Sequence, residues 1–243
     1  MKNTTLALIA GVSIVLAGCA TSVPTKNGVS LNFNYQFKRE PQGKTNRSLI
    51  LIEPKIIFSK NISPNYREKF EKSLKSQVEE MFKAEGYQVI NVADKNTLST
   101  QDKKAGYLAL AISGHIDVLE DTKLKVEANT KNLDQEGVDT SSGFLRLEFF
   151  EPMSLDILHT FNIDLSKLHA KTHYIKPVAT NSGGFMTKKV VHSVSEDSYD
   201  DGIKKILNQI YAKTMKKIDK ELSDKNIDQY EKALKEVKNK TGN

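Results

Sequence analysis

The chain has 243 residues, of which 38% are hydrophobic and 27% are charged, and its formal net charge at pH 7 is +6. The apolar content is low but sufficient for a packed core, which argues against an intrinsically disordered chain. The positive charges are spread along the sequence without a block of five or six, so no nucleic-acid partner is indicated. A single cysteine, Cys19, excludes an internal disulfide.

The N-terminus has the layout of an export signal followed by a tether. Lys2 precedes an apolar run at 6–17, which is too short to cross a bilayer because a spanning helix needs about 20 residues. The next residues, Leu16-Ala17-Gly18-Cys19, resemble the lipobox of bacterial lipoproteins. The resemblance implies a signal peptide at 1–18, cleavage before Cys19, and a lipidated cysteine with a tether at 19–28.

An ordinary signal peptide with an incidental cysteine is the alternative for this segment. Ala20 follows the cysteine, where an aspartate is the inner-membrane retention signal of enteric bacteria. The alanine therefore favours the outer membrane.

The first part of the predicted domain contains a β-α-β unit. Residues 29–37 alternate strictly between apolar and polar side chains, which predicts a half-buried strand, and the apolar run at 49–54 predicts a buried one. A helix is predicted between Ser63, its N-cap, and Gly86, because apolar residues recur there every three or four positions. Residues 87–92 predict the next strand.

Four more elements are expected in the middle of the chain. Residues 97–106 predict a short helix and residues 107–120 a long strand, whereas 121–142 are polar and weakly patterned. Residues 142–165 contain two predicted strands on either side of the turn Glu151-Pro152-Met153-Ser154.

The C-terminal third is predicted to contain a loop and two helices. Residues 166–195 are loop-like, and Ser195 is the expected N-cap of the first helix. The second helix, roughly 224–239, carries a narrow apolar seam formed by Ile227, Tyr230, Leu234 and Val237. Such a seam packs within the chain or pairs with another copy to form a homodimer.

The predicted fold class is therefore α+β, with a mostly antiparallel sheet, one packed amphipathic helix and a C-terminal helical extension. The α+β domain is expected over 29–195 and the C-terminal helices over 196–243. After the signal, the sequence contains no second apolar run of 18 or more residues, so the lipid tether is the expected membrane attachment.

The sequence offers few candidates for chemistry. It contains no G-x-S-x-G, P-loop, H-E-x-x-H or G-x-G-x-x-G after a strand, so an enzyme is disfavoured and no cofactor is expected. His169 and His173 have the spacing of a helical metal pair, but their segment lacks a helical stripe, so no metal site is predicted. Lys123, Lys125 and Lys131 follow the long strand, where an exposed basic loop could meet a carboxylate such as that of sialic acid; a solvated loop is the alternative.

Four segments carry a resemblance to a known family. They are KKAGYLALAISGHI at 103–116, FFEPMSLDILHTFNIDLSKL at 149–168, THYIKPVATNSGG at 172–184 and IYAKTMKKIDKELSDKNIDQYEKALKE at 210–236. Together they resemble the neuraminyllactose-binding hemagglutinin family, which are lipoprotein adhesins of gastric bacteria. The resemblance covers nearly the whole mature chain, so the sequence is identified as a member of that family or a paralogue within it.

The resemblance implies an outer-membrane or surface lipoprotein, also associated with the flagellar sheath, that agglutinates cells through sialylated glycans. In the family that activity was tied to a short basic stretch after the long strand. The matching stretch here is EDTKLKVEANTK at 120–131, in which Lys123 and Lys125 are the candidate glycan-binding residues. The expected function is an adhesin for sialylated glycans or matrix, and the alternative is a structural envelope or sheath lipoprotein that acts through protein–protein contacts.

Overall fold

The computed structural model describes residues 28–38, 43, 45–125, 132–177, 199–222 and 224–241. Within these ranges the chain forms seven strands, four α-helices and one short 3-10 helix. In chain order they are β1 (Ser48–Ile52), β2 (Lys55–Phe58), α1 (Pro64–Ala84), β3 (Gln88–Val92), the 3-10 helix (Lys95–Thr97), α2 (Thr100–Ala105), β4 (Leu108–Lys125), β5 (Asn132–Phe150), β6 (Ile157–Asp164), β7 (His169–Pro177), α3 (Tyr199–Glu221) and α4 (Asp224–Thr241).

The seven described strands form one sheet whose centre is the pair β4 and β5. These two strands make a long antiparallel ladder, from Ala109 opposite Phe150 to Lys125 opposite Asp134. β1 and β2 run parallel to β4 along its other edge, and β6 and β7 pair antiparallel with successive halves of β5. This arrangement confirms the predicted α+β class, and the parallel pairing of β1 with β3 around α1 confirms the β-α-β unit.

The limits of α1 follow from its local sequence. The Ser63 hydroxyl accepts a hydrogen bond from the Tyr66 N–H at 3.4 Å, and Pro64 is the first helical residue, as predicted. Past the end of the helix, Gly86 has a φ of +82°, which L-residues rarely adopt. A Cβ at Gly86 would also stand 2.3 Å from the Gly43 carbonyl oxygen, so no other residue fits there.

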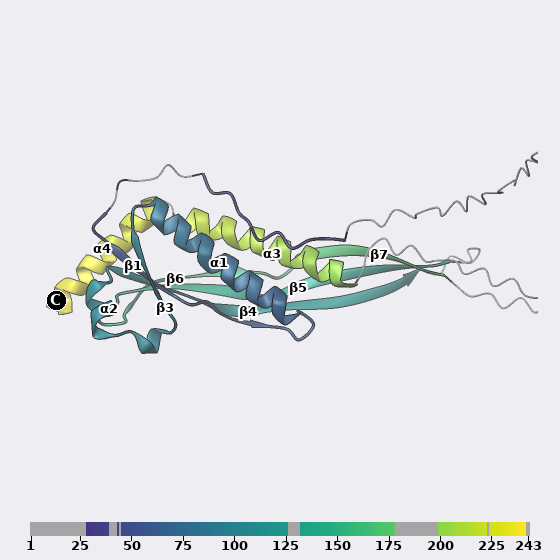
Figure 1. Cartoon of the computed structure of the whole chain (residues 1–243), viewed down its shortest axis with the longest axis horizontal. Coiled ribbons are helices and arrows are strands. Elements are labelled where there is room, and N and C mark those ends of the chain that lie inside the picture. Colours follow the sequence, from purple (N-terminus) through teal and green to yellow (C-terminus); the bar gives the residue numbers. More distant parts are fainter. Residues whose placement is uncertain are drawn as a thin grey trace, which may run out of the picture.

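The main core lies between the sheet and the helices α1 and α3, which cover the same face (Figure 1). Its centre is aromatic: the rings of Phe70 and Tyr211 meet edge to face with centroids 5.3 Å apart, and Phe33 lies 5.0 Å from Tyr211. α3 contributes a row of buried apolar side chains to this core: Ile203, Ile206, Leu207, Ile210, Met215 and Ile218. The first C-terminal helix is therefore an integral part of the fold.

Residues 28–38, called the strap, are extended but pair with no described strand. The predicted alternation of burial is confirmed, since Phe33 is buried while its neighbours on either side are exposed, but the predicted strand is wrong. The strap lies across α1 and α3, whose side chains bond its backbone. The Asn32 N–H donates to Asn208 Oδ1 at 2.7 Å and the Tyr35 N–H to Gln77 Oε1 at 3.0 Å. These bonds replace those that a sheet would supply.

Two segments expected to be loops contain strands. β4 continues to Lys125 and β5 begins at Asn132, so the ladder extends through much of 121–142, and β7 occupies part of 166–195. The short strand β2 was also not predicted. An alternating pattern of apolar residues predicts a strand only where one face of that strand is buried. Strands pair through backbone N–H and C=O groups, which polar residues carry as well, so strands made of polar residues are not visible in the sequence pattern. The predicted cap Ser195 lies outside the described residues.

The apolar seam of α4 packs against its own chain. Tyr230 and Leu234 are 5% and 1% exposed, and the Tyr230 ring stacks on Phe149 and His159 with centroids 4.7 and 4.9 Å away. The sequence left two alternatives for the seam, packing within the chain and pairing with another copy, and in the structure the seam packs within the chain. It places these residues against β5 and β6, while the side chain of Ile227 lies outside the described part.

Candidate binding surfaces

Beyond the start of α3, the strands β4, β5 and β7 continue as a three-stranded arm (Figure 1). The arm comprises residues 120–125, 132–138 and 173–177. Its base is fixed against the helix at Gly202, where a Cβ would stand 1.6 Å from Asp139 Oδ2. The absence of a side chain at Gly202 therefore leaves the space that the buried Asp139 carboxylate occupies.

The predicted glycan-binding residues Lys123 and Lys125 lie in this arm, on β4 and not in a loop. The register puts Lys123 opposite Glu136 and Lys125 opposite Asp134. Residues directly opposite in an antiparallel pair lie on the same face, so each lysine has an acidic neighbour, and the formal charges of the four positions cancel. The third lysine of the predicted stretch, Lys131, lies outside the described residues.

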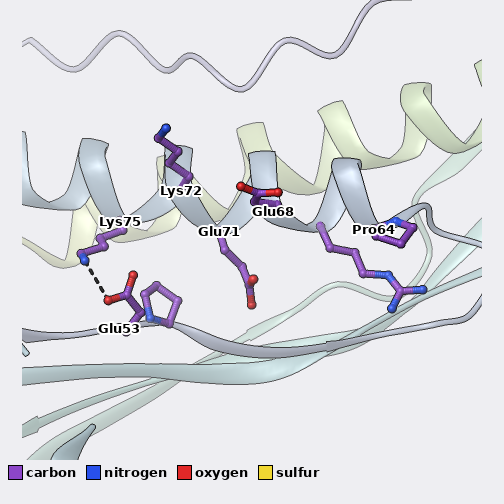
Figure 2. A pocket seen from close by; sticks show the side chains of 8 residues that line it. Glu53, Pro64, Glu68, Glu71, Lys72 and Lys75 are labelled. Carbon is purple, nitrogen blue, oxygen red and sulfur yellow. Dashed lines mark hydrogen bonds and ion pairs between the residues drawn. The ribbon is translucent and has the colours of Figure 1, made fainter. Parts of the chain in front are cut away.

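A second surface is an open cleft between α1 and the connection from β1 to β2 (Figure 2). Its volume is about 570 Å³, and it is lined by Glu53, Pro54, Pro64, Arg67, Glu68, Glu71, Lys72 and Lys75. Three acidic and three basic side chains therefore line it, so the cleft has no net formal charge.

Several charged groups of the cleft hold the protein together. Figure 2 shows Lys75 of α1 reaching Glu53, with Nζ 2.9 Å from Oε2. Glu71 Oε1 accepts a hydrogen bond from the Ile56 N–H of the edge strand β2 at 3.2 Å. Burial raises the pKa of the Glu71 carboxyl, the bond from Ile56 opposes this, and the nearby charge of Glu53 raises it further. Sequence reasoning missed this role of Glu71, although its position beside Phe70 in the apolar stripe was a signal of partial burial.

The histidine pair does not form a metal site. His169 and His173 lie on β7, where four residues span roughly 13 Å, so their spacing does not bring them together as it would on a helix. His169 Nδ1 lies 3.2 Å from Thr140 Oγ1 instead. Over the described ranges as a whole, no three His, Cys, Asp or Glu residues are grouped so that they could hold a metal ion.

The face of the sheet opposite α1 and α3 carries an exposed apolar row. Ile57 on β2 is in register with His115 on β4, which is in register with Phe144 on β5. Ile57 is 69% exposed and Phe144 47%, and Leu119, further along β4, is 54% exposed. Ile57 and Phe144 thus flank His115 across the sheet, and exposed large apolar side chains gathered on one face suit a protein contact. The sequence did not indicate the row, because register between distant strands is not visible in a local pattern.

Both the sequence and the fold are similar to proteins of one family. A family model described as neuraminyllactose-binding hemagglutinin precursor matches residues 10–241. Two relatives named neuraminyllactose-binding hemagglutinin, from two strains of Helicobacter pylori, are each 34% identical over 241 residues, which is 95% of this chain and 92% of each relative. A crystal structure of a neuraminyllactose-binding hemagglutinin homolog from Helicobacter pylori has a TM-score of 0.68 and 35% identity, covering 86% of this chain and 100% of that one. The chain therefore belongs to the neuraminyllactose-binding hemagglutinin family.

Proposed function

We propose that the chain is a lipid-anchored adhesin of the outer membrane whose domain binds sialylated glycans. The observation that carries the proposal is the match, over 95% of the chain, to proteins named for binding neuraminyllactose, which is a sialylated sugar. Shared fold and family support a shared role. The hemagglutinin names of the relatives describe binding proteins, and the proposal accordingly includes no catalytic step.

The proposed membrane attachment is Cys19. Its support is the Leu16-Ala17-Gly18-Cys19 segment behind a short apolar run. Two or more acyl chains hold a protein firmly, since each buried CH₂ contributes about 0.8 kcal/mol. None of the helices in the described part of the chain has the length and apolar character needed to cross a membrane. The proposed location at the outer membrane or flagellar sheath rests on the family resemblance.

The proposed contacts to the glycan come from Lys123 and Lys125 on the arm. A lysine ammonium group donates charge-assisted hydrogen bonds to a carboxylate, and sialic acid carries one. The support for these two residues is their place in the stretch that follows the long strand, which the family resemblance singles out.

The test is binding of the soluble chain, residues 20–243, to a sialylated glycan and to its desialylated counterpart at physiological salt. The expected result is binding of the sialylated glycan only, reduced at least about tenfold in Lys123→Glu/Lys125→Glu, because a hydrogen bond to a charged group contributes about 1.5–3 kcal/mol. The matched control, Lys103→Glu/Lys104→Glu on α2, makes the same change of charge far from the arm and is expected to leave binding unchanged. Equal binding to both glycans would contradict the proposal.

A structural envelope lipoprotein is the second candidate function. The exposed apolar row of Ile57, Leu119 and Phe144 favours it, because such a row suits a protein partner. A homodimer would be part of this second candidate function. Because the seam of α4 is buried within its own chain, the exposed apolar row is a better surface than the seam for contact with a second copy. Equal binding to both glycans would leave this candidate as the better account.

A further inference from the structure

The strand β2 leaves one of its edges without a partner strand. Its first edge pairs with β4, and the Ser59 N–H just beyond it donates to the Ile116 carbonyl oxygen at 2.9 Å. Backbone groups of successive residues in a strand point to alternate sides, so Ile56 and Phe58 turn their N–H and C=O groups away from β4. In the part of the chain that the structure describes, no strand pairs with this second edge, and the outward groups of Phe58 have no hydrogen-bond partner. Such an edge is a template for a further strand.

The other outward residue of β2 is covered by a side chain of α1. Glu71 Oε1 accepts a hydrogen bond from the Ile56 N–H at 3.2 Å, and Figure 2 shows the Glu71 side chain pointing from the helix toward the strand segment beside it. The cleft of about 570 Å³ opens between this side of α1 and the segment that leads into β2. A carboxylate therefore occupies the place that a carbonyl oxygen of a neighbouring strand would take.

The charged side chains of α1 along the cleft are complementary to the same helix reversed. Two acidic residues are followed by two basic ones, in the order Glu68, Glu71, Lys72 and Lys75. The remaining charged residue, Arg67, is used within its own chain, where its Nε donates to the Ile62 carbonyl oxygen at 2.7 Å. If a second copy of α1 ran antiparallel, Glu68 would lie opposite Lys75 and Glu71 opposite Lys72. Twofold symmetry would form each of these pairs twice.

The strand and the helix place the symmetry axis at the same level. The midpoint of the charged row falls between Glu71 and Lys72. Glu71 bonds Ile56, which precedes Ile57, so the same level on β2 falls beside Ile57. Ile57 is 69% exposed on the open face of the sheet. In an antiparallel pair of strands centred on Ile57, the two isoleucine side chains would be direct neighbours, with Cβ atoms roughly 5 Å apart.

We infer that two copies of the chain pair antiparallel through β2, with a twofold axis at Ile57, so that one sheet runs through both copies. Ile56 of each copy then exchanges backbone hydrogen bonds with Phe58 of the other. The Ile56 N–H changes its partner from the Glu71 carboxylate to a carbonyl oxygen of the second copy, and Glu71 turns to Lys72 of that copy.

The pairing goes beyond the proposed function and depends on neither the lipid anchor nor glycan binding. It is also compatible with both. β2 pairs with β4 at residues 113–116, whereas Lys123 and Lys125 lie further along β4. The proposed glycan contacts are therefore outside the paired segment.

The first test is disulfide trapping in the chain 20–243, which lacks Cys19 and so contains no cysteine, and which keeps every residue that the structure describes. Ile57→Cys places a thiol at the axis, where opposite Cα atoms are roughly 4.5 Å apart, within the range of a disulfide. Phe144→Cys is the first control, since it lies on the same face but two strands away, roughly 10 Å from Ile57. Ile157→Cys is the second, since this side chain is 50% exposed on β6.

With oxidised glutathione as the oxidant, Ile57→Cys is expected to form a disulfide-linked dimer at least about tenfold faster than either control, because pairing raises the local concentration of its own thiol. A rate for Phe144→Cys equal to that for Ile57→Cys would show that copies pack face to face through the apolar row, which overturns the inference. Equal rates for all three variants, or no dimer of Ile57→Cys, also overturn it.

The second test changes the charges of α1 and needs no cysteine. Sedimentation of the chain 20–243 is expected to show a reversible dimer, since short paired strands and exposed ion pairs make a small contact. Glu68→Lys puts like charges opposite each other at both ends of the helix pair, and is expected to raise the dimer dissociation constant at least about fivefold.

The matched control is Glu80→Lys, which makes the same change of charge at an exposed position of α1, about 120° around the helix from Glu68. It is expected to change the dissociation constant less than about twofold. An equal effect of the two substitutions would contradict the antiparallel placement of the helices. A chain that stays monomeric at every concentration would contradict the pairing itself.

Discussion

At the residue scale, one polar side chain joins three parts of the fold. Gln77, which is 8% exposed, lies in the apolar stripe of α1. Its Oε1 accepts from the Tyr35 N–H at 3.0 Å and from the Tyr211 hydroxyl at 2.8 Å, while its Nε2 donates to Asn34 Oδ1 and to the Tyr35 carbonyl oxygen, both at 3.0 Å. A buried amide whose donors and acceptor are all hydrogen-bonded holds its partner residues in fixed positions. It connects α1 to the strap and to α3.

Gln77→Leu is expected to lower the free energy of unfolding by about 3 kcal/mol, because the substitution leaves buried partners on Tyr35 and Tyr211 without a hydrogen bond. Urea unfolding measures the change. Gln36→Leu on the exposed side of the strap is the control, with an expected change within about 0.5 kcal/mol. Equal effects of the two substitutions would contradict the role assigned to Gln77.

At the element scale, Tyr230 makes aromatic and polar contacts that fasten the last helix to the rest of the fold. Tyr230 of α4 stacks on Phe149 and His159, and its hydroxyl donates to Glu221 near the end of α3. Burial raises the pKa of Tyr230, and the bond to Glu221 raises it further, so the hydroxyl stays protonated and able to donate. α4 is thus fastened to the sheet and to the preceding helix together.

Tyr230→Ala is expected to lower the free energy of unfolding by about 3 kcal/mol, since it removes a buried aromatic ring and leaves a cavity. The exposed residue Lys232 of the same helix provides the control, and Lys232→Ala is expected to change stability by less than about 0.5 kcal/mol. Light scattering of the wild-type chain complements the unfolding measurement. A dimeric mass that Tyr230→Ala abolishes would show that α4 packs on a second copy.

At the scale of the whole molecule, the two ends of the domain are built from different elements. The strap follows α3 and begins, with Gly28, at the end from which the arm extends, whereas α2 and α4 lie at the other end (Figure 1). One core beneath α1 and α3 connects the two ends, because side chains from the strap, the sheet and both helices belong to it.

Cys19→Ser is expected to abolish processing and membrane attachment in cells, because serine has no thiol to carry the acyl chains. The measurements are the mass of the protein and its distribution between membrane and soluble fractions, with labelled palmitate as a direct reporter of acylation. Ser22→Ala, which changes a hydroxyl in the tether, is expected to leave both unchanged. Unaltered fractionation of the cysteine variant would refute the proposed anchor.

The sequence by itself determined the elements whose faces are buried. The limits of α1 and the buried residues of β5 follow from local spacing, from Ser63 and from Gly86, because burial of one face imposes a period on the chain. The family also followed from the sequence, because its motifs extend along most of the chain. The proposed anchor likewise depends on a contiguous segment ending in Cys19.

Only the tertiary structure decided which segments meet. The alternation of the strap predicted burial correctly, but its partners on α1 and α3 are distant in sequence, and no local pattern specifies them. The register of β4 with β5, which long-range packing sets, likewise decided that Lys123 lies opposite Glu136 and Lys125 opposite Asp134. The arm escaped prediction because backbone hydrogen bonds hold its strands together whatever side chains they carry.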